Sequence, residues 1–299
     1  MTTFANFMTD GGWAVSSLVC VVFTSITLLM NQHFKIPGHI LVFFLRLITV
    51  ILMTPFMFYI PWPETPIFYI VVISTALFGA FSDIRLFNVS AKYGAGVTAR
   101  TLPLVIFLSF ILWFFFDPEL FVEYSKNPIN TIGIVSSLLG CVYFSSQLKK
   151  CNISRAAFIA MLPVIIGYTI NTSLNKFSMQ QGDYTGVVFG YMYLQSVAAI
   201  FFIGGYALWR EKKLKTPNLC KKKVLLATTT LSILWILGMT FQNYAMIFVP
   251  SPSYQIAILQ LAPVLIAIFY YFVKHKEEAD VKSGFGVVAC AILLVLAAI

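Results

Sequence analysis

Charged residues are scarce in this sequence. Asp, Glu, Lys and Arg together make up only 10% of its 299 residues, whereas 59% are hydrophobic. The mean hydropathy of +0.87 lies far above that of soluble domains. Because so few charges cannot cover a water-facing surface, the composition excludes an ordinary soluble protein and predicts a chain surrounded by lipid.

Residues typical of several chemistries are also few or absent. The three histidines form no H-E-x-x-H motif, and the five cysteines show no C-x-x-C spacing, which argues against a metal site or a disulfide framework. The chain has neither the G-x-x-x-x-G-K-[ST] loop that binds ATP phosphates nor a G-x-S-x-G nucleophile motif. The sequence therefore predicts no catalytic residue, no metal, no cofactor and no enzymatic activity.

Long apolar runs dominate what remains. A spanning helix needs about 20 apolar residues, and each run has that length, about twice that of a barrel strand, without alternating polarity. The runs predict an all-α membrane protein with ten transmembrane helices, near 11–31, 38–60, 66–88, 95–116, 129–148, 155–177, 185–208, 223–247, 253–273 and 281–298.

The basic residues lie unevenly in the connections between these runs. Sixteen of the twenty Lys and Arg fall on the side from which the even-numbered helices start, two (Lys126 and Lys176) on the other, and Arg46 and Arg100 within spans. The net charge of +9 therefore reflects the orientation of the chain in the membrane, and no nucleic-acid partner is expected. The positive-inside rule places both termini outside the cytoplasm.

A weak internal repeat organises the spans. Shifting the chain by 160 residues, from 81 to 241, aligns FSDIRLFNVSAKYGAGVTARTLPL with FQNYAMIFVPSPSYQIAILQLAPV without a gap. Both segments cover the third and fourth spans of a five-span half. Because each half has an odd number of spans, residues 1–150 and 151–299 are predicted to form two five-helix inverted-topology repeats, an arrangement typical of transporters.

With this arrangement the sequence resembles the drug/metabolite transporter superfamily in its ten-span, EamA-like form. Further resemblance lies in a Pro and an Arg in the second span, IPGHILVFFLR, and in Leu-x-Pro-like segments of the fourth and ninth spans, TLPLVIFLSFILWFFF and LAPVLIAIFYYFV. Each of these segments precedes an acidic connection and a Gly-bearing span. Members of the family usually have cytoplasmic termini, opposite to the charge count, so the orientation stays open. The resemblance implies that the sixth, eighth and ninth spans line a central cavity, with Tyr168, Asn171, Trp235, Gln242 and Tyr254 as substrate-binding candidates.

Asp83 is the one acid embedded in a span. Its natural partner is Arg100, since both lie about 12 Å below the turn that joins two antiparallel helices. Three interpretations remain open: a static ion pair, a pair at a cavity edge that substrate or a proton can loosen, or side chains that reach the interface. In the second case Asp83 is the candidate for proton coupling.

The repeat extends this set of candidates. It places Asn243 at the position of Asp83 and Gln260 at that of Arg100, so that an amide pair would replace an ion pair. Amides donate and accept hydrogen bonds, which suits a zwitterionic ligand, although they equally hold helices together. Arg46, eight residues into the second span, either joins the cavity or extends to the interface.

These features predict a secondary active transporter that moves a small polar metabolite by alternating access, either by exchange or coupled to protons. Embedded Arg outnumbers Asp, which favours an amino acid or another anionic or zwitterionic solute. The alternatives are a nucleotide-sugar or organic-phosphate exchanger of the same superfamily, an integral-membrane enzyme acting on lipid-linked substrates, and a channel or scaffold. The expected partners are the bilayer and a small-molecule substrate, with a homodimer left open, in the inner (plasma) membrane of a bacterium.

Overall fold

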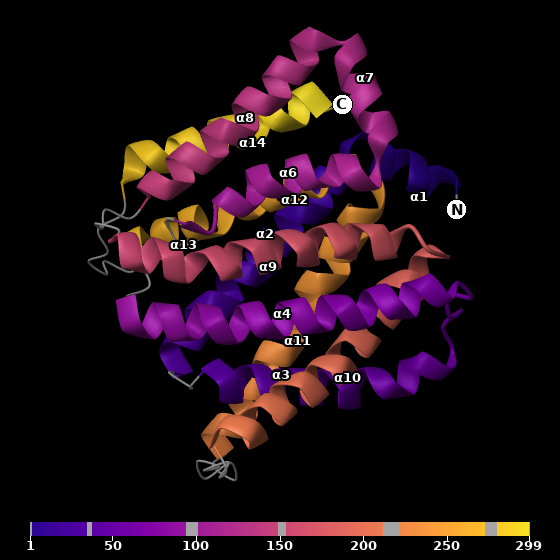
Figure 1. The fold of residues 1–299 in the computed structure, drawn as a ribbon, viewed down its shortest axis with the longest axis vertical. Helices are drawn as coiled ribbons and strands as arrows, with labels where there is room; N and C mark the ends of the chain where they lie inside the picture. Colours follow the sequence, from indigo (N-terminus) through magenta and orange to yellow (C-terminus); the bar gives the residue numbers. More distant parts are fainter. Residues whose placement is uncertain are drawn as a thin grey trace.

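The computed structural model describes residues 2–34, 38–93, 101–148, 154–211, 222–272 and 280–298 (Figure 1), and every element within these ranges is helical. The first half contains α1 (Thr2–Phe7), η1 (Met8–Gly12), α2 (Trp13–Phe34), α3 (Gly38–Met53), η2 (Thr54–Phe58), α4 (Pro66–Tyr93), α6 (Leu104–Phe116), α7 (Pro118–Lys126) and α8 (Pro128–Gln147). The second half contains α9 (Arg155–Met179), α10 (Tyr184–Glu211), α11 (Lys222–Phe248), α12 (Pro252–Leu259), α13 (Leu261–Phe272) and α14 (Val281–Ala298).

The helices confirm a multi-pass integral membrane protein. Within the described residues, eight helical segments are long and apolar enough to cross a bilayer, and a ninth results if α6 and α7, bent by 107° at Asp117, count as one span. The apolar stretch of α14, Lys282–Ala298, is shorter than the eight. Eight or nine candidate spans are therefore found where the sequence analysis predicts ten.

The bundle is built from a few extensive helix pairs. α4 packs along α9, α11 along α2, and α8 along α14, while α10 contacts both α3 and α4. Figure 1 shows the pair α8 and α14 at one end of the long axis, and α3 and α10 at the other. The pairs α4–α9 and α2–α11 lie between these ends, so the middle of the bundle is formed by helices from both halves.

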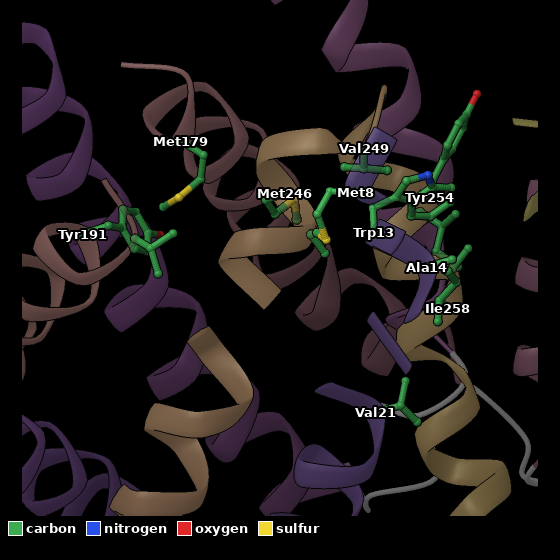
Figure 2. Close-up of a cluster of buried hydrophobic side chains, with 14 of the residues drawn as sticks. Met8, Trp13, Ala14, Val21, Met179, Tyr191, Met246, Val249, Tyr254 and Ile258 are labelled. Atoms are coloured by element: carbon green, nitrogen blue, oxygen red, sulfur yellow. The ribbon is translucent and has the colours of Figure 1, made fainter. Parts of the chain in front are cut away.

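Buried apolar side chains from both halves form one large core (Figure 2). Trp13 of α2 lies beside Tyr254 of α12, with ring centroids 6.2 Å apart. Met8, at the kink where Gly11 adopts a φ of 102°, lies near Met246 of α11. The flexible thioethers fill the irregular space that this kink leaves between the helices.

Glycines of α10 allow one close backbone approach. Gly186 of α10 lies against the carbonyl of Pro61, where a β-carbon would collide, and a β-carbon on Gly190 would lie 3.5 Å from the Trp62 ring. Trp62 also donates a hydrogen bond to the Met57 carbonyl at 3.0 Å. The tandem G-x-x-x-G at 182–190 therefore seats α10 on the connection that precedes α4.

Candidate functional site

One face of α9 is polar and packs against other helices of the bundle. Tyr168, Asn171 and Asn175 follow one another at spacings of three and four residues, so they share a face over about 10 Å. We call these three residues the α9 stripe. Polar side chains within a membrane are costly unless they have partners, which makes the stripe a candidate site.

Asp83 of α4 meets the stripe at its first residue. The Tyr168 hydroxyl donates a hydrogen bond to Asp83 Oδ1 at 2.5 Å, and Asp83 is only partly buried. Arg100, the partner predicted from the sequence, lies outside the described residues, so that ion pair stays a prediction. The embedded carboxylate thus has a hydrogen-bond partner from the other half of the chain.

Small residues bring α4 and α9 close together beside this contact. A β-carbon added to Gly167 would collide with Ser82 Oγ, and one added to Gly79 would lie 3.7 Å from Asn171 Oδ1. Among the described residues, neither Ser82 Oγ nor Asn171 Oδ1 has a hydrogen-bond partner. Two buried acceptors therefore lie beside the Asp83–Tyr168 contact: Ser82 next to Asp83 on α4, and Asn171 one turn after Tyr168 on α9.

Arg46 of α3 belongs to a further group of polar side chains, which α3 and α10 form together. Its guanidinium lies 4.3 Å from the centre of the Trp235 ring and donates a hydrogen bond to Gln195 Oε1 at 3.3 Å. Gln195 in turn donates to the Tyr191 hydroxyl at 2.9 Å. Arg46 also interacts electrostatically with Asp83. The guanidinium thus lies over an aromatic face, which favours a cation, and a role of Arg46 in substrate binding stays a prediction.

The last residue of the stripe meets α11. Asn175 Nδ2 donates to Asn243 Oδ1 at 3.4 Å, and Asn243 is fully buried. Its amide partner is therefore Asn175 of α9, and not Gln260 as the repeat suggests. Nearby, Gln255 donates to the Gln242 carbonyl at 3.4 Å, and Cys20 lies 3.8 Å from Gln242 Oε1. Amides thus continue the polar cluster across α11.

Two candidates lie apart from the stripe. The Tyr254 hydroxyl is hydrogen-bonded to that of Tyr124, and its ring belongs to the apolar core beside Trp13. Gln260 occupies the break between α12 and α13, where its backbone N–H donates to the Ile256 and Ala257 carbonyls. Tyr254 and Gln260 are thus close in sequence to Gln242 and Asn243 but do not lie at the α9 stripe.

Lys176 is a functional candidate that the charge count groups with the connections, although it lies at the end of the predicted run 155–177. Instead of lying in a connection, it belongs to the last turn of α9 and is 3% exposed. Its ammonium donates to the Met246 and Ile247 carbonyls, at 2.7 and 3.0 Å, in the last turn of α11. These carbonyls have no partner within their own helix and carry the negative end of its dipole, which explains why the cation is held there.

The other residues missed from the sequence are amides and tyrosines within spans, namely Asn175, Tyr191, Gln195 and Gln255. Asn175 could have been found, because it continues the helical spacing of Tyr168 and Asn171. Gln195 and Tyr191 carry no such signal, since only the packing of α10 against α3 brings them to Arg46. Within the described ranges, no three His, Cys, Asp or Glu side chains group as a metal site.

Comparison with models of known protein families finds no match to this chain, and comparison with curated proteins finds no similar sequence.

Proposed function

We propose that this protein is a secondary active transporter of the drug/metabolite transporter type, which moves a small anionic or zwitterionic metabolite along the α9 stripe by alternating access. On this proposal the chain is not an enzyme and needs no cofactor. The single observation that carries the proposal is the α9 stripe itself, a row of polar side chains within a membrane helix that contacts α4 of one half and α11 of the other.

The pattern of helix contacts supports ten spans in two inverted five-helix halves. In this arrangement the counterparts are α2 and α9, α3 and α10, α4 and α11, α6 and α12, and α8 and α14. Exchanging each helix for its counterpart turns the contacting pair α4–α9 into the contacting pair α11–α2, and α3–α11 into α10–α4. The pairs α8–α14, α3–α10 and α6–α12 are exchanged into themselves. A pseudo-twofold of this kind lets the two halves rock and expose one shared site to either side in turn.

The chemistry of the cluster supports the substrate class. Arg46 provides an embedded cation over Trp235, and Asp83 provides an acceptor that Tyr168 already engages. A solute with a carboxylate suits the guanidinium, and a primary amine on the same solute suits Asn171 Oδ1, which has no hydrogen-bond partner among the described residues. Amino acids meet these requirements.

Exchange in proteoliposomes tests the proposal. Vesicles loaded with a panel of unlabelled amino acids and other organic anions are assayed for uptake of each labelled solute. We expect saturable uptake that rises several-fold when the same solute is present on the inside. Uptake that is linear with concentration and independent of the internal solute indicates a channel or a leak, and would overturn the proposal.

A matched pair of variants links this transport to the stripe. Asn171→Leu removes the amide whose oxygen has no partner among the described residues, and we expect exchange to fall at least tenfold. Asn130→Leu makes the same change on the exposed surface of α8 and should leave exchange within twofold of the wild type. Equal exchange by the two variants would exclude a role of the stripe in substrate binding.

A further inference from the structure

A groove of about 710 Å³ opens on the outside of the bundle between α4, α9 and α10. Its floor is apolar, with Phe81, Val89 and Phe202 among its residues, and its rim carries the exposed Arg85 and Lys92. None of the described residues that line it is acidic. We call it the basic groove.

The two cations of the basic groove share one face of α4. Arg85 and Lys92 are seven residues apart, which is two helical turns and about 10 Å. The Arg85 guanidinium lies 5.3 Å from the centre of the Phe81 ring, and the Lys92 ammonium 4.9 Å from that of Tyr93. The aromatic rings hold both charges at the rim, with their positive ends available to an anion.

A second groove, of about 320 Å³, continues the first along α4 and α10. The two grooves share Phe202, and the second is lined by apolar side chains such as Ile73 and Leu194. Among its described lining residues only Tyr69 bears a hydroxyl, which donates to the Pro63 carbonyl at 2.9 Å. We call it the apolar groove, and it runs where Figure 1 shows α4 and α10 adjacent.

Along α4 the combined grooves are longer than one leaflet is deep. Arg85 and Ile73 are twelve residues apart on α4, which corresponds to about 18 Å. One leaflet contributes about 15 Å of hydrocarbon to a bilayer core of about 30 Å. An anchor for a phosphate and an apolar track at least one leaflet deep therefore follow one another along the same helix.

We propose that these two grooves together bind an anionic phospholipid, with its phosphate between Arg85 and Lys92 and one acyl chain along the apolar groove past Phe202. Basic pockets between membrane helices bind anionic headgroups in this way. This inference concerns a site on the outer face of α4 and does not depend on the proposed transport function.

A third groove, near the start of α10, lacks the combination of exposed cations and apolar lining among its described residues. About 440 Å³ in volume, it lies between the start of α2, the start of α10 and the end of α11, and it contains Asp183 and the hydroxyl-bearing Ser16 and Tyr184. Its described lining includes an acid and no base, so it would repel a phosphate. Charge thus restricts the lipid site to the basic groove.

Native mass spectrometry of the full chain tests the proposal. The purified protein is titrated with phosphatidylglycerol and, separately, with phosphatidylcholine of the same acyl chains. We expect phosphatidylglycerol to bind at least tenfold more tightly. In the double variant R85Q/K92Q its affinity should fall about 30-fold, since each cation near a lipid surface contributes about a fivefold factor. Binding of phosphatidylcholine should fall by a smaller factor, because its choline cation offsets the charge of its phosphate.

The double variant K126Q/K282Q is the matched control, because it removes two exposed cations from α7 and α14, away from the groove. It should bind phosphatidylglycerol within twofold of the wild type. Equal loss in the two double variants would overturn the proposal, since net charge would then explain binding. Displacement of the lipid by an equal concentration of glycerol 3-phosphate would also overturn it, because the groove would then select a soluble anion.

Discussion

Two helices, α4 and α11, occupy equivalent positions in the 160-residue alignment and both contact the α9 stripe, but with different chemistry. α4 presents the carboxylate of Asp83 to a tyrosine hydroxyl, and α11 presents the amide of Asn243 to another amide. Asn243 is fully buried, whereas Asp83 keeps partial exposure. Both contacts are hydrogen bonds to α9, but only the α4 contact contains a carboxylate that can take up and release a proton.

The largest effect is expected from a substitution of Asp83, which removes the difference between the two contacts. Asp83→Asn makes the α4 contact as neutral as the α11 contact, and we expect proton-driven uptake to fall at least 100-fold while exchange stays within threefold. The reason is that exchange needs only substrate binding, whereas uphill uptake needs a group that titrates. Uptake into proteoliposomes with and without a pH gradient measures both.

Two further variants control this experiment. Glu119→Gln removes an exposed acid of α7 and should leave both activities unchanged. Asn243→Leu should lower uptake and exchange by the same factor, because it removes hydrogen bonding without removing a titratable group. If Asp83→Asn retains normal pH dependence, the carboxylate is a static structural group.

The next largest effect is on stability, where α4 and α9 pack closely at Gly167. Gly167→Val places side-chain atoms where Ser82 lies, which forces α4 and α9 apart and should lower the free energy of unfolding by about 2 to 3 kcal/mol. Reversible unfolding in mixed micelles measures it. Gly205→Val of α10 is the control, because a β-carbon at Gly205 would meet no described atom beyond its own stretch of helix within 4 Å. It carries the same change in helix propensity at little further cost. Similar losses in both variants would show that packing at Gly167 is not tight.

A smaller effect is expected where α11 holds Lys176. Lys176→Met leaves the Met246 and Ile247 carbonyls without their charged donor, but it also removes a buried charge, so we expect a net loss of about 1 to 2 kcal/mol. The same unfolding assay measures it, with the exposed Lys126→Met as the control. A gain in stability would mean that the buried cation is retained for transport and not for folding.

The smallest effect compares the two stripe contacts directly by double-mutant cycles. The cycle of Asn175→Leu with Asn243→Leu should give a coupling energy of about 0.6 kcal/mol, which is average for polar contacts between membrane helices. The cycle of Tyr168→Phe with Asp83→Asn should give about 1.5 kcal/mol, because the acceptor is charged. Equal couplings would indicate that Asp83 is protonated, and hence neutral, in the folded protein.

Much of the fold follows from the sequence. Hydropathy alone predicts the spanning helices, because no other backbone conformation satisfies its hydrogen bonds in lipid, and the starts at Pro66, Pro128 and Arg155 agree closely with the predicted runs. Asp83 stands out as a site residue because an embedded acid is rare. Tyr168 and Asn171 are also predicted, and simple helical spacing adds Asn175.

Only the tertiary structure decides which of these polar groups meet. Asp83 and Tyr168 are 85 residues apart, and Arg46 and Gln195 are 149 apart, so no local pattern can pair them. Lys176 lies in a helix end that hydropathy cannot separate from a connection, and only the end of α11, packed against it, makes it a buried cation. The sequence by itself determined that the chain is a bundle of membrane helices with a few costly polar residues, because transfer into lipid depends on composition and length. Helix packing decided the partners of those residues, because hydrogen bonds depend on atoms within about 3 Å.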